Sequence, residues 1–294
     1  MRITSETMVM RSVDRLQSRM ANLERSQSEL ATGRRILKPS DDPAGARRAS
    51  SLRSAMGSRE QELKNASDAR GWLNAADNQL QSAMSRLSRI RDLTTQGAKT
   101  EGDTARRVLA DEVREIIDEL AGIANTKHLD RPLFGGYTGG LAVERNADGD
   151  WVTNGDGDQV TRRVSDTELV RANVTAAEWL GTGDDNLLGF LDGLVHDLEH
   201  GTPNAVSARL EGLATATDRV ATSLSRIGTA TNRVDSAARR AEDLLLTLRT
   251  ELSDVEDVDI AKGVMELQLH ETAYEATLQA LGRSLPPSLA AFLR

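Results

Sequence analysis

Two histidines and a glutamate near residue 200 have the residue types and spacing of a metal site. His196, Glu199 and His200 fit the H-x-x-E-H pattern of inverted zinc peptidases, with the two imidazoles one helical turn apart. Gly201 and Pro203 follow at once, so the histidines are expected in the last turn of a helix, where basic side chains suit the helix dipole. A zinc site needs a further ligand, and the sequence offers no compelling one. We therefore predict no metal here.

The segment NGDGDQ, which begins at Asn154, has the alternating acidic residues of a calcium loop. Gln159 stands where that loop needs glycine, and Ser165 stands where a bidentate glutamate belongs. The pattern is therefore a poor match to a calcium site. We predict that it binds no calcium.

Adjacent carboxylates and adjacent glycines also invite a chemical interpretation. Asp41 and Asp42 could form a catalytic pair, but neighbouring acidic residues flanked by proline more often cap a helix. Gly135 and Gly136 lack the spacing and the preceding strand of a phosphate loop, so a tight turn explains them. No set of nucleophile, base and orienting group stands out. We predict neither catalytic residues nor a cofactor, and therefore not an enzyme.

Composition favours long, thin helical bundles. The 294 residues are 38% hydrophobic and 28% charged but only 3% aromatic, so leucine, alanine, valine and isoleucine must build the core. The formal net charge of −8 argues against nucleic acid as a partner. Cysteine is missing, which excludes disulfides and thiolate metal sites. We also expect no cleaved signal peptide and no membrane insertion, because no apolar run approaches the roughly 20 residues of a membrane span.

Both ends of the chain carry apolar residues at alternating steps of three and four, the spacing of helices that bury a narrow stripe. Gln27 and Glu271 are the exceptions to this rule. We call these two sets the terminal seams: Val9, Val13, Leu16, Met20, Leu23 and Leu30, and Ile260, Val264, Leu267, Tyr274, Leu278, Leu281 and Leu285. A lone helix of this kind is marginally stable, so each needs a second helix or another subunit.

The first helix is expected to end near Gly33, and Asp42 with Pro43 is expected to begin the second. Helical stripes then follow over residues 66–94 and 109–123, and their short connection implies an antiparallel return. From Pro132 to about Gly183 helical periodicity vanishes, and LAVERNADGDWVT indicates a strand, an Asp148-Gly149 turn and a second strand.

Helical periodicity resumes at Leu187 and runs without a slip from Val220 to Val255. We predict a mainly α fold with a small β-containing insertion: a long antiparallel helical bundle built from both chain arms, with terminal helices that pair as a coiled coil. The predicted parts are a terminal helical domain of residues 1–45 and 253–294, a bundle domain of residues 46–131 and 187–252, and a β-rich insertion of residues 132–186.

Both ends together resemble the terminal regions of bacterial flagellins and their relatives. The resemblance is carried by the N-terminal seam, the run ATGRRILKPSDDPAG and the ending EDVDIAKGVMELQLHETAYEATLQALGRSLPPSLAAFLR. Within that superfamily PSDDP and FGG resemble the flagellar hook-filament junction branch, hook-associated protein 3. The motif residues are Gly33, Pro39, Ser40, Asp41, Asp42, Pro43, Phe134, Gly135 and Gly136.

The resemblance implies a structural subunit that is exported unfolded through the flagellar type III apparatus and is located in the extracellular flagellum. The implied partners are copies of itself, the hook-side junction protein (hook-associated protein 1), flagellin and a flagellar export chaperone. Two alternatives stay open: a short filament flagellin, and a free coiled-coil adaptor or signalling protein. Coupled folding of the terminal seams with neighbouring subunits is the expected mechanism of assembly.

Overall fold

The computed structural model describes residues 5–154 and 159–284, with side chains described for residues 10–154 and 159–282. The chain divides into two compact units. The first consists of Met1–Ser58 and Leu245–Arg294, which we call the terminal arm. The second is Arg59–Leu244, which we call the central unit.

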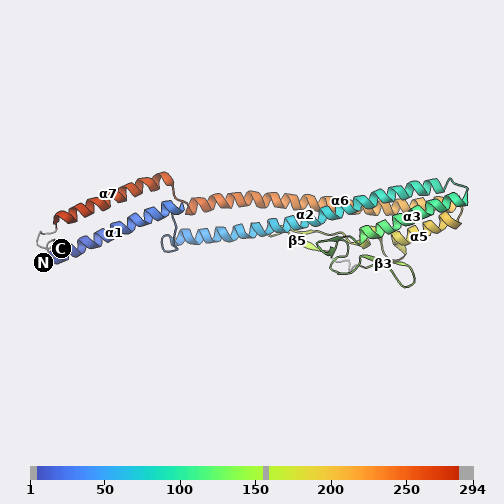
Figure 1. Cartoon of the computed structure of the whole chain (residues 1–294), viewed down its shortest axis with the longest axis horizontal. Helices are drawn as coiled ribbons and strands as arrows, with labels where there is room; N and C mark the ends of the chain where they lie inside the picture. Colours follow the sequence, from blue (N-terminus) through green and yellow to red (C-terminus); the bar gives the residue numbers. More distant parts are fainter. Residues whose placement is uncertain (1–4, 155–158, 285–294) are drawn as a thin grey trace. The chain divides into compact units, whose positions relative to one another are not determined.

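The terminal arm is built around helices α1 (Ser5–Thr32) and α7 (Ile260–Ser284), which lie side by side (Figure 1). It also contains the first part of α2 (Pro43–Gly97) and the last part of α6 (Pro203–Glu256). Gly33, at φ +70°, follows the last residue of α1, as the sequence predicts for a helix that ends in a left-handed residue. The predicted start of α2 at Pro43 is also confirmed.

The central unit buries the stripes that the sequence predicts. Every residue of the predicted stripe on α2 is buried, and α6 contributes Val220, Ile227, Val234 and Ala238 to the same core. Two ion pairs join α2 to α3 (Asp103–Ala124): Arg89 with Glu112 and Arg86 with Glu119. The partners run in opposite order along the two helices, which confirms the antiparallel return. Helix α5 (Leu187–His200) packs on α3 and begins at the predicted residue.

Among the described residues between α3 and α5, the chain forms three two-stranded antiparallel sheets. Strands β3 (Val143–Arg145) and β4 (Trp151–Thr153) are the predicted hairpin, and Gly149 in its turn has φ +91°. Strands β1 (Lys127–His128) and β2 (Arg131–Pro132) pair, as do β5 (Thr161–Arg163) and β6 (Leu169–Arg171). The fold is mainly α with a small β-containing insertion, as predicted.

The insertion differs from the prediction because it contains helical structure where the sequence shows no helical periodicity. Helix α4 (Ala176–Leu180) and a 3-10 turn, η1 (Gly183–Asp185), precede α5. A helix of five residues is too short to show a period. A capping box holds its start, in which the side chains of Thr175 and Glu178 bond each other's backbone N–H.

Candidate assembly surfaces

The α1/α7 pair buries part of each terminal seam. Leu16, Leu23 and Leu30 on α1 are partly buried, and so are Leu267, Tyr274 and Leu281 on α7. Successive members of each set are seven residues apart, about two helical turns, so each set lies on one face of its helix. The two helices contact each other, and these are the faces that are partly covered.

The remaining seam residues stay in solvent although the two helices are paired. Val13 and Met20 are 41% and 48% exposed, and Ile260, Val264 and Leu278 are 68%, 41% and 43% exposed. Met10, Met265 and Leu269 add further exposed apolar side chains. Leu285 and the side chain of Val9 lie outside the described part of the chain. The α1/α7 pair therefore leaves several of the apolar side chains of its two helices exposed.

The sequence analysis missed two small residues in the α1/α7 contact. Ser26 on α1 is 7% exposed. Gly263 on α7 is buried, and a Cβ placed there would lie 2.9 Å from Cδ2 of Leu30. A glycine inside an otherwise helical pattern was the available signal, since it usually has a packing reason. Here it allows the two helices to approach closely at Leu30.

The PSDDP motif shapes the turn between α1 and α2. The Asp42 Oδ1 atom accepts a hydrogen bond of 2.8 Å from the backbone N–H of Gly45 in the first turn of α2. That bond, with help from the Arg35 guanidinium, holds the pKa of Asp42 below its ordinary value. Asp41 instead accepts from the backbone N–H groups of Leu37 and Lys38, at 3.2 and 2.8 Å. Pro39, Ser40 and Pro43 are exposed.

Backbone contacts tie this turn to the connection between α6 and α7. The carbonyl of Gly33 accepts from the N–H of Val258 at 2.9 Å, and the N–H of Arg35 donates to the carbonyl of Glu256 at 2.6 Å. Glu256 is 5% exposed and its carboxylate accepts from Arg53. The two chain segments of the terminal arm therefore meet in a short antiparallel bridge. Sequence periodicity gives no signal for such a contact, because its groups are mostly main chain.

The FGG motif belongs to the core of the central unit. The ring of Phe134 is fully buried, with its centroid 5.6 Å from that of Trp179 on α4. The Phe134 carbonyl accepts a 2.8 Å bond from the N–H of Ala176 at the start of α4. Gly135 is buried against Pro132, and Gly136 turns the chain at φ +67°. The motif therefore builds the tight turn that the sequence predicts and holds α4 in place.

The histidine pair occupies the end of α5, as predicted. His196 and His200 are exposed, with ring centroids 4.9 Å apart. The Glu199 carboxylate between them accepts from the Arg114 guanidinium on α3, and this bond lowers the pKa of Glu199. Asp197 is bound by Arg209. Both carboxylates next to the imidazoles are thus engaged by arginine, which favours a structural role for this turn.

Four residues of the calcium-like pattern, 155–158, lie outside the described part of the chain. Within the described residues, no cluster of three or more histidine or acidic side chains is arranged to hold a metal ion. None of the described helices is both long and apolar enough for a membrane span.

These features define a class of helical subunit whose terminal helices leave apolar faces open to a partner. The bacterial flagellin N-terminal helical region matches residues 3–136, and the bacterial flagellin C-terminal helical region matches residues 210–285. The chain belongs to the bacterial flagellin family.

Among characterised proteins, flagellin B of Helicobacter pylori is 36% identical over 107 residues, which is 36% of this chain and 21% of that protein. Flagellin of Clostridium tyrobutyricum is 31% identical over 129 residues, 43% of this chain and 34% of that protein. The chain thus aligns with about a fifth to a third of the length of these relatives.

Solved structures share the fold over a larger part of the chain. A flagellar hook-associated protein from Vibrio parahaemolyticus superposes with a TM-score of 0.69 at 24% identity, covering 74% of this chain and 100% of that one. Hook-associated protein 3 from Legionella pneumophila gives a TM-score of 0.64 at 14% identity, covering 69% and 98%. At these identities the similarity establishes the fold.

Proposed function

We propose that this chain is a structural subunit of the bacterial flagellum that joins the hook to the filament. The observation that carries the proposal is the partly covered α1/α7 pair, whose exposed side chains include Met20, Ile260 and Leu278. Complete burial of a fully exposed side chain of this size stabilises a structure by about 1.5–3 kcal/mol, so side chains that are already partly covered gain roughly half of that. Neighbouring copies that cover these seams therefore provide the driving force for assembly.

The junction is favoured over the filament by two features. PSDDP and FGG are the motifs that resemble the junction branch. In this fold PSDDP forms the turn into α2, and FGG packs against the start of α4. The fold similarity to hook-associated proteins also extends over nearly the whole of those chains. The implied neighbours are the hook-side junction protein on one face and flagellin on the other, and each copy contacts further copies laterally.

The proposed route to this position is export of the unfolded chain through the flagellar type III apparatus, with a chaperone that covers the terminal seams before export. Folding of the seams is completed by assembly, so ordering and binding become one event. Assembly of this kind needs no catalyst.

Substitution of one exposed seam residue tests the proposal. Leu278→Asp is expected to leave the central unit folded, because Leu278 lies in the terminal arm and outside that core. It is expected to abolish incorporation into flagella, because a charge would be buried at the new contact. Leu278→Met, which keeps the apolar character, is the matched control and should incorporate normally. Normal motility of the Leu278→Asp strain would refute the role of the seam.

A deletion strain tests the place in the flagellum. Loss of the protein should leave hooks without filaments and release flagellin into the medium. The filament alternative has one observation in its favour, since the matched characterised relatives are flagellins. It predicts long polymers when purified chain is seeded with filament fragments, whereas a junction subunit should stop after a short layer.

A further inference from the structure

The turn between β1 and β2 presents a leucine under unusual constraint. Leu129 and Asp130 have φ values of +50° and +60°, so both central residues of this two-residue hairpin are left-handed. Asn-Gly or Asp-Gly would form such a turn with little strain, whereas a leucine in this region is strained. Leu129 is also 74% exposed. Strain and exposure at one residue point to a contact that the single chain does not contain.

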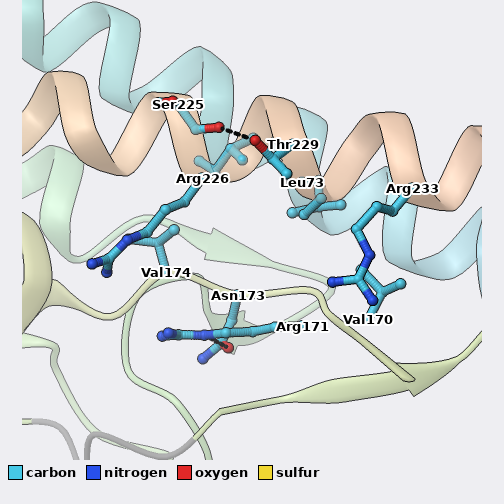
Figure 2. Close-up of a pocket in the computed structure, with 11 residues that line it drawn as sticks. Leu73, Val170, Arg171, Asn173, Val174, Ser225, Arg226, Thr229 and Arg233 are labelled. Carbon is cyan, nitrogen blue, oxygen red and sulfur yellow. Dashed lines mark hydrogen bonds between the residues drawn. The ribbon is translucent and has the colours of Figure 1, made fainter. Parts of the chain in front are cut away.

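The same unit contains a cavity whose lining complements this turn. The cavity has a volume of about 270 Å³ and lies between α2, α6 and the segment 170–174. Its apolar floor is formed by Leu73, Val170, Val174, Ile227 and Ala230. Figure 2 shows Arg171, Arg226 and Arg233 spread around this space.

The arginines at the cavity are only partly neutralised by neighbouring carboxylates. Glu178 is shared by Arg171 and Arg226, and Glu168 is shared by Arg233 and Arg240. The three arginines that line the cavity, together with Arg240, which does not line it, thus share two carboxylates, and this leaves a positive excess in the set and spare N–H donors. The rim of the cavity is suited to a further carboxylate.

We propose that the Leu129-Asp130 turn of one copy inserts into this cavity of a second copy. Leu129 packs on the apolar floor, and the exposed carboxylate of Asp130, which forms no ion pair with any residue that the structure describes, joins the arginine rim. This inference rests on the proposed assembly of copies and names two of the surfaces that meet.

The two proposed surfaces lie at the same level along α2. The His128 ring of the hairpin packs edge-on against Trp72 of α2, at 5.0 Å, and the next residue of α2, Leu73, lines the cavity. Turn and cavity therefore lie at one level of α2. Because the two halves are unlike, each copy in a pair keeps one free turn or one free cavity, and the contact can continue around a layer.

Cysteine crosslinking tests the contact directly, because the natural chain contains no cysteine. One chain carries Leu129→Cys and a second carries Ala230→Cys, so a disulfide can form only between copies. The matched control replaces Ala230→Cys by Val108→Cys, which is 64% exposed on α3 and does not line the cavity. In flagella of cells that express both chains, the first pair should give at least about tenfold more disulfide-linked dimer, since docking raises the effective concentration of the thiols.

A second variant removes the proposed contact residues while keeping the hairpin folded. Leu129→Asn with Asp130→Gly keeps the turn and removes its strain, so the purified chain should melt at the same or a higher temperature. It should nevertheless lose filament attachment in cells. Equal crosslinking of both cysteine pairs, or normal filaments with the Asn-Gly variant, would overturn the contact. If the deletion strain also kept its filaments, the proposed function itself would fail, so the two failures are distinguishable.

Discussion

Single side chains in this protein define the ends of long helices. Asp42 illustrates this, because its carboxylate accepts from the N–H of Gly45 in the first turn of α2 while its neighbour Asp41 bonds the preceding loop. The carboxylates of Asp41 and Asp42 thus accept hydrogen bonds from two different stretches of backbone, which is the arrangement of caps rather than of a catalytic pair. The structural interpretation of PSDDP could be reached from sequence because capping depends on local spacing alone.

The Asp42 cap makes stability depend on pH in a stated direction. The folded-state pKa is lowered, chiefly by the hydrogen bond from Gly45, so the stabilisation is present above the unfolded-state pKa and is lost as pH falls through the folded value. We expect Asp42→Asn, which keeps an acceptor, to flatten the fall in helical circular dichroism below about pH 4. Asp42→Ala should instead lower the melting temperature at neutral pH. An unchanged acid profile for Asp42→Asn would contradict the cap.

Elements differ in how well sequence predicts them, and the difference follows from their length. The stripes of α2, α3 and α6 continue over several turns, so the buried positions could be read from spacing. Strands β5 and β6 are three residues each and α4 is five, and they are held by distant partners such as Arg233 and Arg226. Tertiary contacts of this kind leave no local period.

In the terminal arm, residue spacing alone does not predict which face of α7 packs against α1. The a/d pattern places Ile260, Val264 and Leu278 in one seam with Leu267 and Tyr274, but the helix pair covers the latter two and leaves the former three exposed. The contact face is shifted toward Gly263, where Leu30 approaches most closely. A small residue carries little weight in a hydrophobic pattern, so periodicity alone could not locate this face.

Two substitutions at Gly263 separate helix propensity from packing. Alanine favours a helix over glycine by about 1 kcal/mol. Its Cβ would lie 2.9 Å from Cδ2 at the flexible end of Leu30 and 3.4 Å from Cγ2 of Val258, so a small shift of Leu30 accommodates it and Gly263→Ala should hold or raise arm stability. Valine adds bulk and a stiff branched side chain, so Gly263→Val should lower stability by about 1–3 kcal/mol. Denaturant unfolding followed by circular dichroism measures both. Equal effects of the two variants would show that α1 and α7 do not touch here.

At the scale of the whole molecule, burial is uneven. The large hydrophobic cluster, from Ala66 to Ala238, lies in the central unit, whereas the α1/α7 pair holds its contact with partly buried side chains and leaves others in water. Local opening costs less free energy where fewer apolar contacts must be broken. The arm is therefore the part whose order assembly can change most.

This uneven burial predicts different rates of amide hydrogen exchange in the free and the assembled protein. In dilute solution the amides of α1 and α7 should exchange much faster than those of α2 around Leu73–Leu93, because opening the arm exposes little additional apolar surface. In isolated flagella the same α1 and α7 amides should become strongly protected, since neighbouring copies cover Met20, Ile260 and Leu278. The central amides serve as the internal control, because their burial is complete within one chain. Protection of α1 and α7 in the dilute monomer equal to that of the central core would favour the free coiled-coil adaptor, whose terminal helices need no neighbour, over a subunit completed by assembly.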